Sequence, residues 1–579
     1  MSAGVASAGA VTATVMEQLA QVMVDEGCKH LFTLMGAGNL WLIHHLDVQH
    51  GLPVHHLRHE NGAIGAADGY ARATGRLGWA TVTQGPGFTN TITALLTASR
   101  GRTPMILIVT DTSNLDPQRF PFAGGVQALA PEVLLDPLGI ESVRASGADA
   151  GAVLRAAAQR ARAESRTIVF VMPAGLDRLE ADPLPDATDL ATLEAPDAAS
   201  AVTAVDPAPV DPAQISAAVD ALEGCSAPVL LAGRGVVEAD AASEVLRLAE
   251  LLGARVATSV PASGVLGEHP AVIGPFGGFS IGETERIIAG SDGLVVIGAS
   301  LNLFQTRKGE FTQGRTIVRV DLDPAVVEGA VTVPVRGDAR SAAAALADEV
   351  ARRAAGRASA PDSDAAGASR IPLPAFPLPA IPLPTIDDAD RSEPGRIDPR
   401  ALAIEFERVL PRERRVFIDN GHFGAFPVLY LSYTAPRSLI WMPDFGAVGS
   451  SLAASYASAV ADPGTQSVLF IGDCGLYLTL GDLETAVRER VPLLVVCMND
   501  GAAGSELAHM KDWGVPPEQA IFGYADLAAL AIGMGAQGAL IAETGDLAPA
   551  LAAWDRTRGP LLLDCHISRA VRSPIYDHV

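Results

Sequence analysis

The sequence is short of basic residues, and this shortage excludes a class of partner. Lys and Arg number 42 against 66 Asp and Glu, so the net charge is −24. Phosphate backbones are bound through basic patches, so nucleic acid is not expected as a partner. A small anion can still bind where backbone N–H groups and a metal ion receive it.

Paired cysteines, a leader segment and long apolar runs are also missing. The five cysteines form no CxxC pair, which favours a reducing compartment over a disulfide framework. The N-terminus has no basic region followed by a long apolar core, and no stretch is apolar over the roughly 18 residues of a membrane span. These features predict a soluble, cytoplasmic protein without a membrane partner.

The chain does contain an alternation of strand-like apolar runs and amphipathic helices. Residues 104–112 and 166–175 are typical of buried strands that end in turns, and 153–164 is typical of a helix. This alternation predicts an α/β fold of three doubly wound parallel-sheet domains, because parallel strands need helical crossovers. The domains are expected at 1–185, 205–353 and 397–579, with a Pro-rich linker at 354–396.

The linker holds the repetitive stretch "IPLPAFPLPAIPLPTI", residues 371–386. Its regular prolines favour an extended polyproline conformation, which is semi-rigid. A ligand for an SH3-type domain is one interpretation. A strap between domains is the favoured one.

Oxygen-bearing side chains follow two successive strands of the third domain. Strand 467–472 precedes Asp473, a helix is expected over 479–490 with Thr479 or Asp482 capping its first turn, and the next strand precedes Asn499. A strand–helix–strand unit makes the two strands parallel, so their carboxyl ends lie at one edge of the sheet.

That edge is where open α/β sheets bind ligands, so Asp473, Asn499 and Asp500 are expected to converge there. Carboxylate and carbonyl oxygens suit Mg²⁺, with phosphate oxygens and water completing its shell. The backbone N–H groups of "GDCG" (472–475) could also receive phosphate. The alternative is that both acids simply cap turns.

The motif "GDCG" followed by "MND" (498–500) resembles the GDG-x(n)-NN signature of thiamine diphosphate enzymes. The segments 58–78 and 84–90 resemble the pyrimidine-binding domain of the acetolactate synthase and benzoylformate decarboxylase group. The segment 444–460 resembles the G-x-hydrophobic-G part of the diphosphate-binding domain. The resemblance implies a pyrimidine-binding, a central and a diphosphate-binding domain, in that order, along essentially the whole chain.

The resemblance also assigns cofactor contacts. Glu60 matches the glutamate that hydrogen-bonds the aminopyrimidine ring and promotes the tautomer that removes the thiazolium proton. The alternative for Glu60 is an ion pair with Arg58 or Arg72. Val448 matches the apolar side chain that props the two rings apart, and the Gly446 carbonyl would accept from the amine.

The metal and the diphosphate have their own matching residues. The resemblance implies Mg²⁺ ligands from Asp473, Asp500 and the Ala502 carbonyl. Gln127 resembles a polar residue that faces substrate. Further contacts to the diphosphate are expected from Gly421, His422, Cys474, Gly475 and Asn499.

Several positions depart from the family pattern. Cys474 replaces the second glycine of GDG, Asp500 replaces the commoner asparagine, and "LMGAGN" (34–39) replaces a proline-glycine turn. The stretch 505–528 does not reproduce the tryptophan- and glutamine-containing segment of acetolactate synthases. These departures put acetolactate synthesis itself in doubt but leave the cofactor residues in place.

The predicted function is a thiamine diphosphate- and Mg²⁺-dependent enzyme that breaks or forms a C–C bond beside a carbonyl. It would be a 2-oxo acid decarboxylase or carboligase acting on a small 2-oxo acid or aldehyde, assembled as a homodimer or homotetramer. The alternatives are a 2-hydroxyacyl-CoA lyase type, an oxidoreductase using FAD or NAD(P), and a non-catalytic homologue. The central domain could hold FAD or an ADP/CoA group, and a domain without a nucleotide is favoured.

Overall fold

The computed structural model describes residues 13–184, 210–324, 330–358, 380–386 and 389–577. The chain divides into two compact units. The first contains residues 1–204, 442–461 and 479–489, and the second contains 205–441, 462–478 and 490–579. Each unit is described by itself.

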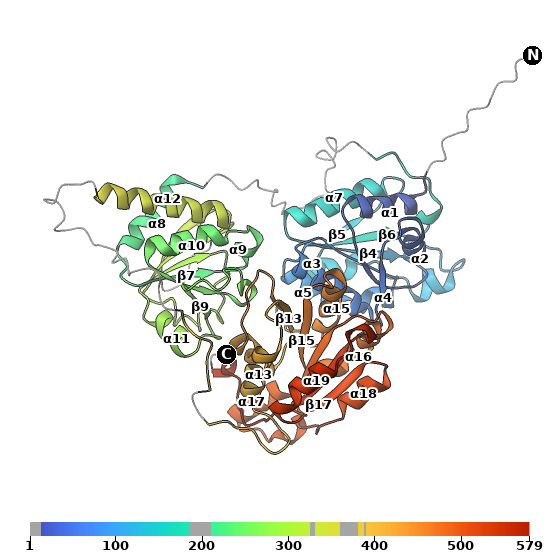
Figure 1. Ribbon diagram of the computed structural model, residues 1–579. Coiled ribbons are helices and arrows are strands. Elements are labelled where there is room, and N and C mark those ends of the chain that lie inside the picture. Colours follow the sequence, from blue (N-terminus) through green and yellow to red (C-terminus); the bar gives the residue numbers. More distant parts are fainter. Residues whose placement is uncertain (1–12, 185–209, 325–329, 359–379, 387–388, 578–579) are drawn as a thin grey trace, which may run out of the picture. The chain divides into compact units, whose positions relative to one another are not determined.

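The first unit holds a sheet of six parallel strands with helices on both faces (Figure 1). Its strands are β1 (Leu31–Leu34), β2 (Val54–His56), β3 (Gly78–Val82), β4 (Met105–Asp111), β5 (Glu141–Arg144) and β6 (Thr167–Pro173). Its helices are α1 (Val15–Asp25), α2 (Leu40–His44), α3 (Glu60–Thr74), α4 (Pro86–Thr89), α5 (Ile92–Arg100), α6 (Glu132–Leu138) and α7 (Ala150–Ala163).

The strands of this sheet follow the order β2-β1-β3-β4-β6-β5. Helices α1, α2 and α7 bury their apolar residues against one face, and α3 and α5 lie on the other. All seven residues of β4 are buried, as expected of a central parallel strand covered on both faces.

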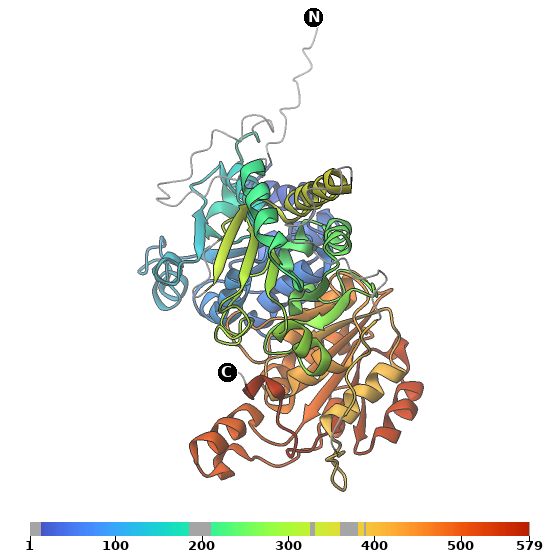
Figure 2. The ribbon, with the colours of Figure 1, turned by 90° about the vertical axis from the view of Figure 1, so that its left-hand side faces the viewer.

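The second unit begins with another six-stranded parallel sheet, in the order β12-β11-β10-β7-β8-β9. Its strands are β7 (Pro228–Ala232), β8 (Arg255–Thr258), β9 (Val272–Pro275), β10 (Gly293–Ile297), β11 (Thr316–Asp321) and β12 (Val331–Arg336). Its helices are α8 (Pro212–Glu223), α9 (Arg234–Glu238), α10 (Ala242–Leu252), α11 (Gly282–Ala289) and α12 (Ala339–Ala358). Helices α8, α9, α10 and α12 pack on one face, and α11 packs on the other (Figure 2).

The third sheet lies in the same unit and has the order β14-β13-β15-β16-β18-β17. Its strands are β13 (Arg414–Ile418), β14 (Leu439–Trp441), β15 (Gln466–Gly472), β16 (Leu494–Asn499), β17 (Gln537–Ile541) and β18 (Leu561–His566). Its helices are α13 (Pro399–Val409), α14 (Ala425–Tyr430), α17 (Gly504–Trp513), α18 (Leu527–Gly533) and α19 (Leu547–Ala553). Numbered along the chain, its strands repeat the order of the first sheet.

Two helices that follow strands of the third sheet in sequence belong wholly or partly to the first unit. Helix α15 (Ser451–Ala461) belongs to that unit, and α16 (Asp473–Arg488) is divided at Thr479. Thr479 has non-helical angles, φ −127° and ψ 17°, so α16 is kinked there.

The predicted α/β fold with three parallel sheets is confirmed. The helix predicted from Thr479 agrees with the second half of α16, which follows the break at Thr479, and a further half that was not predicted begins at Asp473. Asp482 lies in the first turn after the break, where its carboxyl group accepts from the Arg58 N–H. Helix α12 continues to Ala358, into the stretch predicted as linker. Most of the Pro-rich stretch, residues 371–379, lies outside the described residues, and 380–386 has no regular secondary structure.

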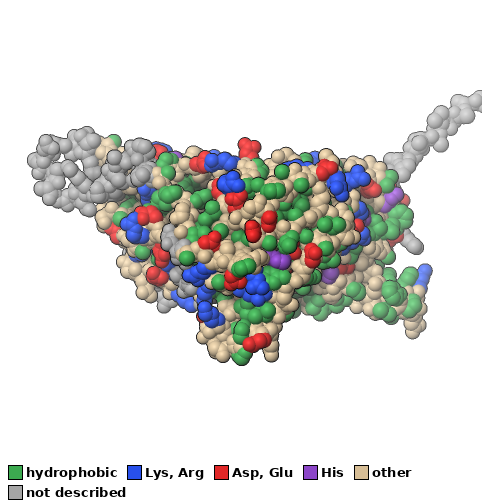
Figure 3. Space-filling model, turned by 60° about the horizontal axis from the view of Figure 1, so that its bottom comes forward, with side chains coloured by type: hydrophobic (Ala, Val, Ile, Leu, Met, Phe, Trp, Pro, Cys, Tyr) green, Lys and Arg blue, Asp and Glu red, His purple; other side chains and the backbone are tan. Residues whose placement is uncertain are grey.

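Among the described helices, none combines the length and the apolar character that crossing a membrane requires. Acidic and basic side chains are interspersed over the face drawn in Figure 3.

Candidate functional site

Two neighbouring strands of the third sheet bring the predicted metal ligands together. Strands β15 and β16 pair in parallel, with Gly472 opposite Met498. Asp473 follows β15 directly, and Asp500 follows β16, so both acids lie at the same edge of the sheet. The convergence predicted from the sequence is confirmed in the backbone register.

Both carboxyl groups are buried beside one another. Asp473 is 7% exposed and Asp500 is 8% exposed. Burial raises the pKa of Asp473 to about 6. Burial, followed by the charge of Asp473, raises the pKa of Asp500 to about 7. Two buried acids that repel each other favour a divalent cation, which would relieve both effects.

The turn after β16 is stabilised by hydrogen bonds from its backbone N–H groups to the side chains of Asn499 and Asp500. Gly501 has φ +61°, a left-handed conformation that suits glycine. Its N–H donates to Asn499 Oδ1 at 3.0 Å, and the Ala502 N–H donates to Asp500 Oδ1 at 3.0 Å. Asn499 Nδ2 donates to Asp564 Oδ1 at 2.8 Å, so both ends of the Asn499 amide are used within the protein.

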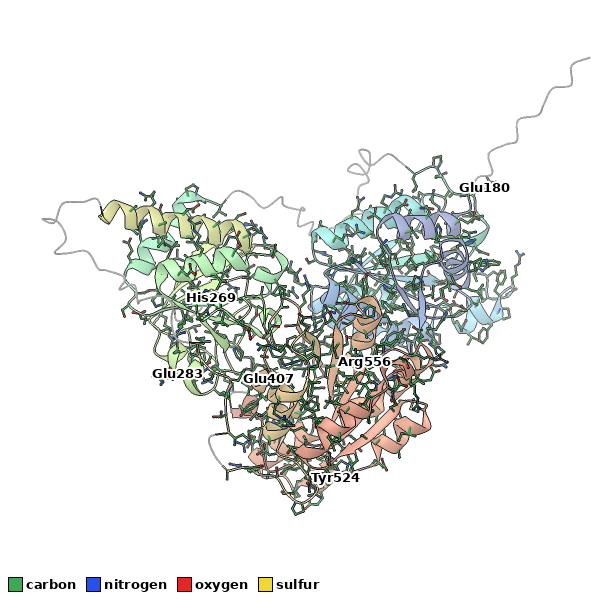
Figure 4. The ribbon with its side chains drawn as sticks, viewed as in Figure 1. Glu180, His269, Glu283, Glu407, Tyr524 and Arg556 are labelled. Atoms are coloured by element: carbon green, nitrogen blue, oxygen red, sulfur yellow. The ribbon has the colours of Figure 1, made fainter. Side chains whose placement is uncertain are left out.

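Arg569 holds the same turn from outside. Its guanidinium donates to the carbonyl oxygens of Asp500 and Gly501. Tyr524, labelled in Figure 4, lies 5.0 Å from that guanidinium and donates from its hydroxyl to Ile567 O at 3.0 Å. Because Arg569 contacts backbone carbonyls and not the carboxylates, its positive charge only partly offsets the negative charges of Asp473 and Asp500.

Cys474 fits into the turn where the family pattern has glycine. Its Sγ–H donates to the Ala502 carbonyl at 3.7 Å, the oxygen predicted as a metal ligand. Burial and the charge of Asp473 raise the pKa of Cys474 to about 11, so the thiol stays protonated. A carbonyl oxygen has two lone pairs, so it can accept from the thiol and still bind a cation.

His422 borders this edge as a neutral ring. Its Nε2 accepts from the Ser573 N–H at 2.9 Å, which leaves the proton on Nδ1. Burial lowers the pKa of His422 to about 4. A Cβ atom on Gly504 would lie 2.4 Å from Asp500 Oδ2 and 3.2 Å from His422 Cβ. This glycine, the first residue of α17, therefore leaves open the space between the acid and the imidazole.

Glu60 lies at the start of α3, in the first unit. The helix is capped by His59, whose Nδ1 accepts from the Asn61 N–H at 3.0 Å. Asn90 Nδ2 donates to Glu60 Oε2 at 2.9 Å, and a Cβ on Gly87 would lie 3.7 Å from Glu60 Oε1. The turn 84–90 therefore lies against the carboxyl group.

The structure does not support an ion pair between Glu60 and Arg58. Arg58 pairs with Glu484, and Arg72 pairs with Asp68 and with Asp444. Glu60 itself is half-buried and bound by an amide.

Gln127 is joined to the same turn through a buried amide. Gln84 Nε2 donates to Gln127 Oε1 at 2.9 Å, and the Thr83 hydroxyl donates to Gln84 Oε1 at 2.6 Å. A Cβ on Gly85 would lie 2.6 Å from the Gln127 carbonyl oxygen. This chain of hydrogen bonds uses the Gln127 Oε1 as an acceptor and leaves its NH₂ group as a donor.

Gly446 and Val448 lie in the loop that precedes α15, also in the first unit. Gly446 has φ +73°, and Val448 is 42% exposed, which leaves its apolar side chain able to support a ligand. The loop is attached to α3 through the Arg72–Asp444 pair at 2.8 Å.

Sequence reasoning missed several of these contacts. Asn90 and Gln84 stand inside the segment that carried the resemblance, so that segment held the signal for them. The roles of Arg569 and Asp564 depend on contacts more than 60 residues apart in sequence, and no local pattern marks them. Two histidines close to Glu60 in sequence have structural contacts: His59 caps α3, and His55 pairs with Glu489.

The glycine-bearing strand ends of the central sheet pack against each other. A Cβ on Gly233 would lie 2.1 Å from Gly298 O, and one on Gly235 would lie 2.8 Å from Gly298 Cα. These glycines therefore serve the close approach of two loops.

A cavity of about 660 Å³ lies elsewhere in the second unit. It is bordered by loops of the central sheet, by residues 380–385 and by residues 428–434. His269 and Glu283, labelled in Figure 4, lie on its wall. None of the predicted site residues lines it.

In the part of the chain that the structure describes, no three His, Cys, Asp or Glu side chains cluster closely enough to hold a metal. A cation at Asp473 and Asp500 would therefore take its remaining ligands from carbonyl oxygen, water or a bound phosphate. Two carboxyls and a carbonyl fit Mg²⁺ held together with a diphosphate.

Comparisons with known proteins agree along the chain. The thiamine pyrophosphate enzyme models match in order: the N-terminal TPP binding domain over residues 13–128, the central domain over 215–346 and the C-terminal TPP binding domain over 419–565. Sulfoacetaldehyde acetyltransferase of Castellaniella defragrans is 26% identical over 93% of this chain and 90% of that protein. Acetolactate synthase isozyme 3 large subunit of Escherichia coli (strain K12) is 25% identical over 86% of this chain and 83% of that protein.

A solved structure shares the fold. The thiamine diphosphate-dependent 4-hydroxybenzoylformate decarboxylase of Rhodococcus jostii RHA1 matches with a TM-score of 0.75 and 20% identity, over 96% of this chain and all (100%) of that one. Together, the three successive family matches and the full-length relatives show that the chain belongs to the thiamine pyrophosphate enzyme family.

Proposed function

We propose that this protein is a thiamine diphosphate- and Mg²⁺-dependent enzyme that breaks or forms a C–C bond beside a carbonyl. The observation that carries the proposal is the buried pair of acids, Asp473 and Asp500, at the exits of adjacent parallel strands. The family match supports the cofactor, and the acid pair supports the cation that would join its diphosphate to the protein.

The residues divide into two sets with different tasks. Asp473, Asp500 and the Ala502 carbonyl would hold Mg²⁺. Phosphate oxygens would accept from the Nδ1–H of His422 and the backbone N–H of Gly475. Gly421, next to His422, would lie beside the phosphate. The Cys474 thiol and the Asn499 amide would keep the turn in shape.

The second set would act on the reactive end of the cofactor. When bound, thiamine diphosphate supplies a carbon that adds to a carbonyl and accepts electrons as the C–C bond breaks. Glu60 would share a proton with a pyrimidine ring nitrogen, with Asn90 holding its other oxygen. Gly446 would accept from the amine through its carbonyl, and Val448 would support the bend between the rings.

The substrate is proposed to be a small 2-oxo acid or an aldehyde. Gln127 Oε1 accepts from Gln84, so the NH₂ group of Gln127 is the end that would donate to a carbonyl or carboxylate oxygen of the substrate. Both named relatives and the solved structure carry names of acyl-transfer, synthase or decarboxylase enzymes, which supports this class of reaction.

We also propose a homodimer or a dimer of dimers, with the cofactor between the pyrimidine-binding domain of one subunit and the diphosphate-binding domain of another. This arrangement rests on the family resemblance. Sedimentation of the loaded protein tests it, and a fully active monomer contradicts it.

Calorimetry and a substrate screen test the proposed function. The protein, freed of cofactor by dialysis against a chelator, should bind thiamine diphosphate when Mg²⁺ is present and bind it far more weakly without the cation. The loaded protein should then release CO₂ from at least one 2-oxo acid, or join its acyl group to an aldehyde. Absence of cofactor binding would contradict the proposal.

A further inference from the structure

The chain segment that leads into α3 is held by the second half of α16, within the first unit. The Thr485 hydroxyl donates to His56 O at 3.2 Å, and the Arg488 guanidinium donates to the same carbonyl. Glu489 pairs with His55 at 2.8 Å. The second half of α16 and the adjoining Glu489 therefore hold the last two residues of β2.

Asp482, on the same half of α16, contacts Arg58, which stands two residues before Glu60. Its side chain is buried, with the residue 2% exposed, and its Oδ1 accepts from the Arg58 N–H at 3.2 Å. Its neighbour Glu484 pairs with the Arg58 side chain. Both the backbone and the side chain of Arg58 are thus bound by α16.

Gly62 makes room for the Asp482 carboxyl group. A Cβ atom at Gly62 would lie 2.3 Å from Asp482 Oδ2 and 2.7 Å from Oδ1, so a side chain there would force the carboxyl group to move. Gly62 stands two residues after Glu60, on the first turn of α3. The acid therefore lies between the residue before the helix cap and the first turn of the helix.

A buried carboxyl group is costly unless it serves a partner that an apolar side chain cannot satisfy. Burial raises the pKa of Asp482 to about 7. The Arg58 N–H precedes the helix and has Asp482 as its acceptor. An apolar residue at 482 would leave that donor without one.

The geometry connects this acceptor to Glu60 through two residues of backbone. Arg58 is fixed by Asp482, His59 then caps α3 through its bond from Asn61, and Glu60 is the first helical residue. Glu60 is thereby held from the backbone side, while Asn90 holds its carboxyl group.

We propose that Asp482 is a positioning residue for Glu60: by accepting the Arg58 N–H beside Gly62, it sets where the first turn of α3 presents the Glu60 carboxyl group. The inference rests on the proposed function of Glu60 toward the pyrimidine ring. Asp482 acts through the backbone and does not itself touch the cofactor.

Two substitutions separate positioning from charge. Asp482→Asn keeps an oxygen that accepts from the Arg58 N–H, so hydrogen–deuterium exchange at the thiazolium carbon should stay within about threefold of the wild type. Asp482→Ala removes the acceptor and should slow that exchange about 10- to 100-fold, because small misplacements of a catalytic group have effects of this size. Binding of Mg²⁺ and thiamine diphosphate, measured by calorimetry, should change by less than about threefold in both variants.

A second readout needs no cofactor. Amide hydrogen exchange at residues 58–60 of the cofactor-free protein should be at least about tenfold faster in Asp482→Ala than in the wild type. It should be near the wild-type rate in Asp482→Asn. Equal protection in all three proteins would overturn the proposal.

Asp398→Ala is the matched control for lost stability. Asp398 is another buried acid, and its side chain caps α13 in the second unit by accepting from the Arg400 N–H at 2.9 Å. Its loss should lower the melting temperature without slowing exchange at the thiazolium carbon. If Asp482→Ala lowers the melting temperature to the same degree and leaves that exchange unchanged, Asp482 is structural and the proposal is wrong.

Failure of the proposed function gives a different result. In that case the wild type itself neither binds the cofactor nor accelerates exchange at its thiazolium carbon. The amide exchange of residues 58–60 then still decides whether Asp482 orders the start of α3.

Discussion

The first and third sheets share one strand order, yet their strand ends are used differently. In both, the third and fourth strands along the chain form the central pair, and open α/β sheets bind ligands beyond the carboxyl ends of their strands. In the third sheet the exits of β15 and β16 carry the buried acids Asp473 and Asp500. In the first sheet the matching strands are β3 and β4, and the loop after β1 packs on their carboxyl ends: the Gly38 N–H donates to Thr83 Oγ1 at 3.2 Å, and the Thr110 hydroxyl donates to Gly38 O at 2.7 Å.

The residue proposed for catalysis in the first unit comes from a different place. Glu60 follows β2, the edge strand, and not the central pair. The two sheets therefore share a strand order, but the loops after their strands determine which strand end binds a ligand. A change at the third sheet's exits should affect cofactor binding, whereas a change at the first sheet's closed exits should affect folding.

The largest expected effect is at Asp473. Asp473→Ala should weaken binding of thiamine diphosphate at least about 100-fold with Mg²⁺ present, because a carboxylate ligand is lost from a site with few protein ligands. Calorimetry measures it. The matched control is Asp111→Asn at the end of β4 in the first sheet, a buried acid that pairs with Arg144 at 2.8 Å. Asp111→Asn should bind thiamine diphosphate as the wild type does. Equal losses of affinity in both variants would contradict the proposal that only the third sheet's strand ends bind the cofactor.

The next effect is a pH dependence of the cofactor-free protein. Asp500 has a folded-state pKa of about 7, above its usual 3.8. Below the usual pKa both states are protonated and nothing is lost. As pH rises from about 4 to about 7 the unfolded chain ionises first, so Asp500 lowers stability, by roughly 2 to 4 kcal/mol at the upper end.

Urea denaturation of the wild type and Asp500→Asn checks this. The amide does not ionise, and its oxygen can still accept from the Ala502 N–H. The variant should therefore match the wild type near pH 4 and exceed it near pH 8 in free energy of unfolding. Added Mg²⁺ with thiamine diphosphate should reverse the order. A difference in free energy of unfolding between the two proteins that does not depend on pH would contradict the raised pKa of Asp500.

A smaller effect is expected at the closed exits of the first sheet. A Cβ on Gly38 would lie 2.3 Å from Gln84 Oε1 and 2.7 Å from Thr110 Cβ. Gly38→Ala should lower the free energy of unfolding by about 1–3 kcal/mol through overpacking. The control is Gly533→Ala, which meets nothing within 4 Å and should be neutral. Thermal denaturation of both variants decides whether the exits are closed by packing.

The smallest effect is at Cys474. Its weak hydrogen bond to the Ala502 carbonyl at 3.7 Å shapes the turn, so Cys474→Gly, the family residue, should change cofactor affinity by about threefold or less. Calorimetry under the conditions used for Asp473→Ala measures it. Loss of binding in Cys474→Gly would make the thiol a principal part of the cofactor site.

Much of this arrangement could be predicted from local pattern. Apolar runs such as that of β4 mark buried parallel strands, and the parallel pairing of β15 and β16 brings Asp473 and Asp500 together. The half of α16 after Thr479 could also be predicted, but the half before it could not, because Cys474 and Gly475 have low helix propensity. The chain is nevertheless helical from Asp473, and the break at Thr479 separates this half from the predicted one.

Local sequence pattern also could not predict the contacts that hold the chain segment leading to Glu60. The contact between Asp482 and the Arg58 N–H joins residues 424 positions apart. A buried acid in the middle of an amphipathic helix is indistinguishable in sequence from one that caps a turn. The glycine at 62 that makes room for it is one of 57 in the chain, and nothing nearby marks it.

The division of α16 at Thr479 has a consequence for how the sequence can change. The helix begins with an acid proposed to bind the metal and carries, nine residues later (482 − 473), the acid proposed to position Glu60. Because Thr479 is not helical, the two halves need not keep one helical phase, whereas Asp482, Thr485 and Arg488 lie on the same half. Inserting or deleting one residue between Asp482 and Thr485 would turn Asp482 by about 100° and shift it by about 1.5 Å along the helix axis relative to the other two. The length of this half is therefore more tightly constrained than the length of the chain across the kink.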